Sequence, residues 1–143
     1  MEVKGEVEAQ GLSRALRKTM ARCKDLRPAW ELVGMDLLRS IDSNFDAEGR
    51  PSAWAPWTAA YAEKRAKKKP GKILTLDARL RRSITSEPDA RGVTIGSNVV
   101  YARAQQLGRK DINLPPRPFA VVQDADWPKI EKTIGDYIEG AWA

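Results

Sequence analysis

Apolar residues recur at helical spacing near the beginning of the chain. The first stripe contains Leu12, Leu16, Met20 and Cys23. A second, wider stripe contains Trp30, Val33, Met35, Leu37, Leu38, Ile41 and Phe45. Proline lacks an N–H and disfavours helix at the residue before it, so we place a break between Asp25 and Pro28. The pattern predicts two N-terminal helices, the second with two packing neighbours.

This periodicity stops in the segment from Asp46 to Lys72. The segment contains the helix breakers Gly49, Pro51, Pro56, Pro70 and Gly71. Between them, good helix formers occupy residues 59–68, and Thr58 can cap their first turn. We therefore expect a long loop around one short helix. Its breakers and its like charges predict that residues 46–72 are mobile in the free protein.

Beyond the loop, β-branched residues alternate with period two. Residues 83–86 and 92–96 flank the turn-forming sequence EPDAR, which predicts an antiparallel hairpin. We expect a further strand at residues 119–122 and a final helix over residues 127–138, capped by Asp124 or Asp126. The order of helices, long loop, small antiparallel sheet and C-terminal helix predicts a single α+β domain over residues 1–143.

Composition excludes several kinds of chemistry. The chain has no histidine, which removes the commonest general base and every histidine metal site. Cys23 is the single cysteine, so neither an internal disulfide nor a cysteine-pair zinc site can form. Aspartate pairs that could serve a cell-wall hydrolase lie where helix ends are expected. We therefore expect no catalytic residue, no metal and no cofactor. With no long apolar run and no signal-like start, we also expect no membrane.

Positive charge is concentrated in the long loop. The formal net charge is +6, and the sequence pI is about 9.6. A candidate basic patch consists of Lys64, Arg65, Lys67, Lys68, Lys69 and Lys72. Such a patch fits DNA phosphates or an acidic protein surface, and a merely solvated charge run is the alternative. Aromatic residues do not alternate with these charges, which favours the acidic protein surface.

Tryptophan and arginine near prolines suggest a docking surface. The candidates are Arg50, Trp54, Trp57 and Arg117, because these two residue types are enriched at interface hot spots. Two alternatives stay open. The tryptophans could complete the domain's own core, and Arg117 could make an internal salt bridge.

Four segments carry a resemblance to a known family. They are FDAEGRPSAWAPW (residues 45–57), ILTLDARLRRSI (73–84), VTIGSNVVYARAQQLG (93–108) and LPPRPF (114–119). In this order they resemble the phage virion morphogenesis family, which includes Mu-type morphogenesis proteins and the tail-completion proteins of P2-like phages. Family members usually carry Thr-Gly or Ser-Gly where this chain has Asp77-Ala78, so the turn there is expected to differ.

The resemblance implies a structural protein that completes the tail and joins it to the head. Its expected partners are other virion proteins, at the tail tube end and at the head-neck connector. Its expected location is the host cytoplasm during assembly and then the virion. We expect a closed ring of about six copies in the particle and allow a monomer in isolation. The alternative function is a basic nucleic-acid-binding module of a prophage or mobile element.

Overall fold

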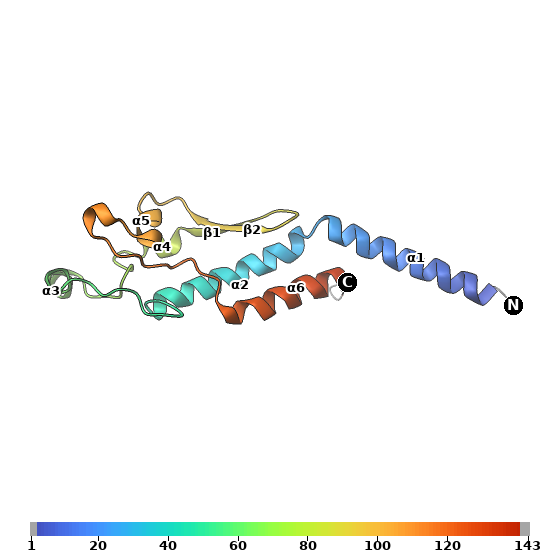
Figure 1. Ribbon diagram of the computed structural model, residues 1–143, viewed down its shortest axis with the longest axis horizontal. Helices are drawn as coiled ribbons and strands as arrows, with labels where there is room; N and C mark the ends of the chain where they lie inside the picture. Colours follow the sequence, from blue (N-terminus) through green and yellow to red (C-terminus); the bar gives the residue numbers. More distant parts are fainter. Residues whose placement is uncertain (1–2, 141–143) are drawn as a thin grey trace.

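The computed structural model describes residues 3–140, with side chains from residue 13 onward. Two helices open the chain, α1 (Val3–Lys24) and α2 (Arg27–Asp46). Pro28 lies in the first turn of α2, so the predicted break is confirmed. Figure 1 shows α1 projecting beyond one end of an elongated body. At its C-terminal end, α1 meets the body where the Arg22 Nη1 donates to the Ile138 carbonyl oxygen at 3.4 Å.

Helix α2 is the central element. A β-hairpin lies along one side of it, and α6 (Trp127–Glu139) runs back antiparallel along the other side (Figure 1). Together with the loops at the C-terminal end of α2, these neighbours bury Ala29, Val33, Gly34, Leu37, Ile41, Asn44 and Phe45. The two neighbours expected from the wide apolar stripe are thereby confirmed.

The hairpin consists of β1 (Ile84–Pro88) and β2 (Val93–Ser97), paired antiparallel. At its turn, the Asp89 carboxylate accepts hydrogen bonds from the backbone N–H groups of Arg91 and Gly92, at 2.7 and 2.9 Å. An aspartate that binds the backbone two and three residues ahead favours such a turn. With helices before and after this sheet, the α+β fold class is confirmed.

The prediction of a strand at residues 119–122 is wrong, because this segment is irregular. Its backbone groups bind side chains instead of another strand. The Gln106 Oε1 accepts from the N–H groups of Phe119 and Ala120, at 3.0 Å each. The Asn44 Nδ2 donates to the Phe119 carbonyl at 2.8 Å. Buried backbone groups need hydrogen-bond partners, which can be backbone or side-chain atoms. Here the side-chain amides of Asn44 and Gln106 replace the partners that a neighbouring strand would provide.

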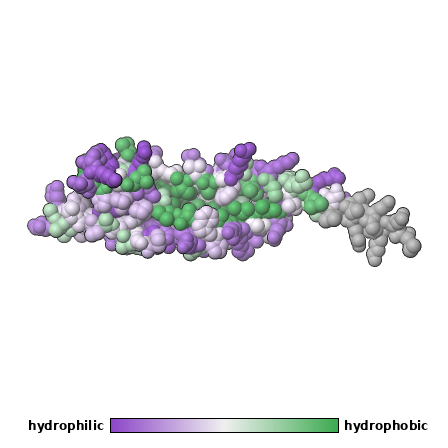
Figure 2. Space-filling view, in the orientation of Figure 1, coloured by the Kyte–Doolittle hydropathy of each residue, from purple (hydrophilic) through white to green (hydrophobic). Residues whose placement is uncertain are grey.

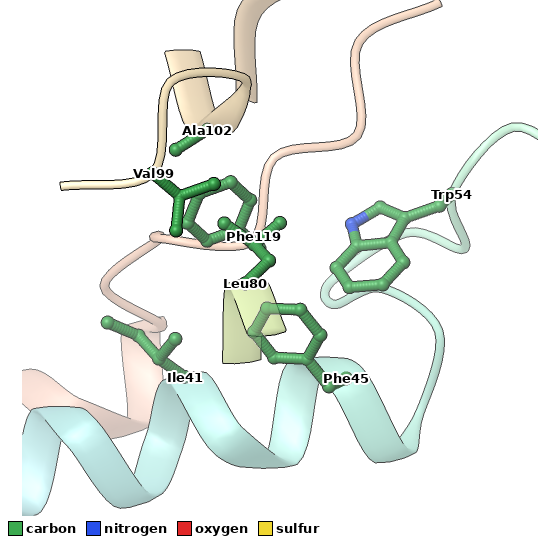
Figure 3. Packing of buried hydrophobic residues seen from close by; sticks show 7 residues of the cluster. All are labelled: Ile41, Phe45, Trp54, Leu80, Val99, Ala102 and Phe119. Atoms are coloured by element: carbon green, nitrogen blue, oxygen red, sulfur yellow. The ribbon is translucent and has the colours of Figure 1, made fainter. Parts of the chain in front are cut away.

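The hydrophobic core gathers at the C-terminal end of α2 (Figure 3). Its members are Ile41, Phe45, Trp54, Leu80, Val99, Ala102 and Phe119. Phe45 is fully buried and meets the Trp54 ring edge to face, with centroids 5.6 Å apart. The centroid of the Phe119 ring lies 5.7 Å from that of Phe45. Trp54, Val99 and Phe119 come from irregular segments, and Leu80 and Ala102 come from short helices. The core therefore joins the connecting segments to α2 rather than layering long regular elements.

A polar network accompanies this core. The Arg50 guanidinium donates from Nε to the Asn44 Oδ1 at 2.8 Å and from Nη2 to the Ser40 carbonyl at 2.6 Å. The Asp126 carboxylate accepts from the Ser40 hydroxyl and from the Gln123 N–H, both at 2.8 Å. The predicted cap of α6 is not formed, because the Asp126 side chain at its N-cap makes no capping hydrogen bond to this helix. Asp126 instead ties the turn before α6 to α2.

Short helices fill the long connections. They are α3 (Ala59–Lys68), α4 (Arg79–Arg82) and α5 (Ala102–Leu107), with 3-10 turns η1 (Lys110–Ile112) and η2 (Asp124–Asp126). The predicted cap of α3 is confirmed, because the Thr58 hydroxyl oxygen accepts from the Tyr61 N–H at 3.4 Å. Arg81 of α4 binds the carboxylates of Asp42 and Asp46 on α2. Its guanidinium lowers the pKa of Asp42 from the ordinary value.

Apolar side chains remain on the surface of this slender body. Figure 2 shows an apolar band over α2 and its two neighbours, bordered by polar residues. On α2 and α6, the side chains of Leu32, Met35 and Trp127 are 44%, 49% and 53% exposed. Within residues 3–140, no helix is both long and apolar enough to cross a membrane.

Asn44 should be the most sensitive polar position of the fold. Asn44→Ala removes the partner of both the Arg50 Nε and the Phe119 carbonyl. Because buried polar groups left without a partner lose their hydration, we expect a loss of roughly 2 to 4 kcal/mol in the free energy of unfolding. Chemical denaturation monitored by tryptophan fluorescence would measure it. The exposed Asn98→Ala is the control, and equal effects of the two changes would contradict this account.

Ala78 precedes α4 with φ of 56°, in the left-handed region. This conformation is strained for a residue with a Cβ and free for glycine. Ala78→Gly should therefore raise the free energy of unfolding by about 1 kcal/mol. Ala66→Gly, within α3, should lower it by a similar amount. Urea midpoints would compare the two variants, and a loss of stability in Ala78→Gly would refute the proposed strain.

Candidate docking groove

A groove of about 660 Å³ opens at the end of the body away from α1. Its walls come from α3, from the segment before α4, from the start of α5 and from the proline-rich segment after η1. The large apolar and aromatic side chains that line it are Trp57, Tyr61, Leu74, Leu76, Tyr101 and Ile112. A concave, mostly apolar site with a few polar groups is the usual form of a binding site in proteins.

Arg117 holds two walls of the groove together. Its guanidinium donates from Nε to the Ala55 carbonyl at 2.8 Å and from Nη2 to the Pro56 carbonyl at 3.1 Å. Its backbone N–H donates to the Gln105 carbonyl of α5 at 2.8 Å. Burial lowers the pKa of Arg117 from its ordinary value. The guanidinium nevertheless keeps its charge at neutral pH, because arginine does not deprotonate in proteins.

Arg65 is the second buried cation of the groove. It lies on α3 and is only 6% exposed. Its guanidinium carbon lies 5.1 Å from the centroid of the Trp57 ring, within cation–π distance. The Nε and Nη1 atoms are buried and have no hydrogen-bond acceptor among the described residues. The Gln105 Oε1, which also lies in the groove wall, is buried and has no donor.

The charge of the groove is unbalanced. Arg65, Arg79 and Arg117 line it together with a single carboxylate, Asp77. The Asp77 side chain accepts from the Arg79 backbone N–H at 3.3 Å. No carboxylate of the described residues forms an ion pair with Arg65 or Arg117. The site therefore presents positive charge inside an apolar surface.

The structure separates the four docking candidates. Trp57 and Arg117 meet in the groove. Arg50 lies in the polar network beside α2. Trp54 is 5% exposed in the core, where its Nε1 donates to the Pro118 carbonyl at 2.8 Å. Its position favours the alternative that this tryptophan completes the domain's own core. The alternative salt bridge of Arg117 is not formed, because its partners are backbone carbonyls.

The basic patch is likewise divided. Arg65 points into the groove, whereas the five lysines are exposed: Lys64, Lys67, Lys68, Lys69 and Lys72. Lys67 pairs with Glu63 on the same helix at 2.7 Å. Lys72 donates to the Asp46 carbonyl at the end of α2. One member of a uniform run of charges is thus buried, while the others face solvent beside the groove.

Several groove residues were not identified from the sequence. Tyr61 and Gln105 lie on short helices, and Tyr101 directly precedes α5. Ile112 ends η1, and Leu76 lies on an irregular segment. No periodic pattern marks these positions. A usable signal was the excess of large apolar residues in segments that form neither an amphipathic helix nor a strand. No cluster of potential metal ligands occurs among the described residues.

Comparison with known proteins agrees with the resemblance in the sequence. Residues 7–139 match the phage virion morphogenesis family. The chain is 28% identical over 136 residues to the Mu-like prophage FluMu G protein 2 of Haemophilus influenzae, a match that covers 92% of this chain and 91% of that protein. No solved structure matches the chain significantly.

The two loop tryptophans should respond differently to truncation. Trp54→Ala opens a cavity against Phe45 and leaves the Pro118 carbonyl unpaired, so we expect a loss of roughly 3 to 5 kcal/mol in the free energy of unfolding. Trp57→Ala removes a half-buried wall of the groove and should cost about 1 kcal/mol or less. Thermal and urea denaturation would rank the variants. Equal losses would show that Trp57 belongs to the core as much as Trp54 does.

Proposed function

The chain belongs to the phage virion morphogenesis family, and from this premise we propose that it completes the tail and joins it to the head. It is a structural protein of virion assembly. Its action is to dock to other virion proteins at the tail tube end and at the head-neck connector. Assembly takes place in the host cytoplasm, and the protein remains in the neck or tail end of the particle.

The groove is the observation that carries the docking mechanism. It combines an apolar lining with the buried cations Arg65 and Arg117, and no carboxylate of the described residues pairs with either of them. Buried arginines and aromatic side chains are the groups that dominate binding energy at protein interfaces. Arg50 and Trp54 stabilise the groove indirectly, because their hydrogen bonds fix the loop that leads to Trp57.

The exposed lysines suit a second contact. Lys64, Lys68 and Lys69 stand free of ion pairs in the described part of the chain, next to the groove. They would attract an acidic patch on the neighbouring virion protein and speed its encounter more than they would tighten the final complex. The same lysines could approach the phosphates of DNA that passes through the neck. Binding of duplex DNA that weakens steeply with salt would support that second role.

A ring of several copies would allow this slender protein to cover the end of the tail tube. We propose that about six copies assemble head to tail in the particle, because heterologous contacts must close on themselves to avoid open fibres. The apolar band over α2 and its neighbours provides area for such contacts (Figure 2). A body with so much half-buried apolar surface needs cover in its working state.

Deletion of the gene is the decisive experiment. Without the protein, filled heads and tails should both accumulate in the lysate without joining, since neither part loses its own components. Negative-stain electron microscopy of the lysate and plaque counts would measure the defect, and the gene supplied from a plasmid should restore joined particles.

Two outcomes would contradict the proposal. Normal infectious particles from the deletion strain would show that the protein is dispensable for assembly. Empty or absent heads beside normal tails would place its action in head formation instead.

A further inference from the structure

We propose that the groove binds a carboxylate-bearing, apolar peptide segment of a partner protein, with Arg65 as the residue that receives the carboxylate. This inference rests on the proposed function, since the partner is another protein of the virion, and it adds the chemistry that the partner must present. It follows from three features of the groove: an unpaired buried cation, an unpaired acceptor and an apolar lining.

The unpaired cation is Arg65. Arg65 is 6% exposed, and its Nε and Nη1 are shielded from solvent and have no acceptor among the described residues. The face of Trp57, 5.1 Å away, offsets only part of the charge. Burying a guanidinium without an anion is unfavourable, and a hydrogen-bonded carboxylate is the partner that compensates it best. The free groove is therefore destabilised in a way that an acidic ligand would relieve.

The unpaired acceptor shows which kind of anion fits. The Gln105 Oε1 is buried in the same groove without a donor. The phosphodiester backbone of DNA offers acceptors only, so it would leave this oxygen unsatisfied, and a base N–H within a duplex would have to leave the base stack to reach it. A peptide offers both groups, a side-chain carboxylate for Arg65 and a backbone N–H for Gln105. The pair of unsatisfied atoms therefore favours a protein segment over the backbone of a DNA duplex.

The lining completes the description of the ligand. Leu74, Leu76 and Ile112 form apolar walls beside the aromatic rings of the groove. Leu76 and Ile112 are 49% and 58% exposed in the free chain, so a ligand can still cover much of their surface. Asp77 lies at the same groove and would repel a second acidic group placed near it. The ligand is thus a segment in which one glutamate or aspartate stands next to large apolar residues.

A peptide titration tests the proposal with the full chain. The probe is a blocked hexapeptide of leucines around one glutamate, and its matched control carries glutamine in place of the glutamate. NMR should show shifts of the Trp57 indole N–H with the glutamate peptide, and binding to the glutamine peptide should be roughly tenfold weaker, as expected for one charge-assisted hydrogen bond. Acidification that protonates the glutamate should weaken binding in the same way.

Two arginine variants separate binding from folding. Arg65→Met should abolish the preference for the glutamate peptide, yet keep or raise the melting temperature, because it removes a buried charge that has no partner. Arg103→Met, on the exposed side of α5, is the matched control and should change neither property. Arg65→Met should also reduce tail joining in complementation of the deletion strain.

Three results would overturn the inference. Equal binding of the two peptides, or none, would show that Arg65 does not select a carboxylate. A strong fall in melting temperature for Arg65→Met would give Arg65 a structural role inside the fold. Displacement of the glutamate peptide by oligothymidylate at equal concentration would assign the groove to a nucleic acid. None of these results depends on whether the deletion strain joins heads to tails, so failure here leaves the assembly role standing.

Discussion

The structure depends on the anchoring of irregular chain segments to the last turn of α2. Phe45 is the apolar half of this anchor, fully buried and in contact with the rings of Trp54 and Phe119. Asn44 is the polar half, since its amide binds both the Phe119 carbonyl and the Arg50 guanidinium. A two-stranded sheet cannot supply a core by itself. Neighbouring residues on one helix therefore fix two loops that are far apart in the sequence.

The groove is a consequence of this anchor. Trp54 binds the Pro118 carbonyl, and Arg117 binds the carbonyls of Ala55 and Pro56, so the two loops are joined twice within a few residues. These bonds set Trp57 and α3 opposite the segment that ends at Arg117. Prolines suit such a place because the ring restricts the backbone and leaves no N–H that would need an acceptor. The groove walls are held by the fold before any ligand arrives, which reduces the entropy lost on binding.

The parts of the fold that the sequence predicted are those with a local cause. Pro28 marks the break before α2, Thr58 caps α3, and Asp89 shapes the hairpin turn, each through atoms a few residues away. The strand expected at residues 119–122 failed for a nonlocal reason. Its backbone partners are the side chains of Asn44 and Gln106, and no pattern within those residues could reveal them.

The candidate docking groove shows the same distinction between local and nonlocal causes. Trp57 and Arg117 were identified by residue type, which also selected Trp54, although only the tertiary packing decides which indole is buried. Arg65 was grouped with five lysines because the sequence shows only a run of charge. What distinguishes it is burial beneath Trp57, together with the absence of an acceptor among the described residues. At Asp77-Ala78 the chain departs from the Thr-Gly or Ser-Gly pair usual in the family. Ala78 has a left-handed φ, which explains why a glycine would suit that position.

An unpaired cation in a preformed groove suits a protein that must act at one stage of assembly. Leaving Arg65 without an anion lowers the stability of the free chain, and a partner's carboxylate recovers that free energy only when it is seated in the apolar groove. An exposed lysine binds acidic groups in solution weakly and with little selectivity, because water screens it. A buried arginine instead rejects ligands that lack the apolar surface needed to displace water from the groove. In the proposed mode of binding, selection of the partner comes from combining charge with burial, and the adjacent lysines would contribute mainly to the rate of encounter.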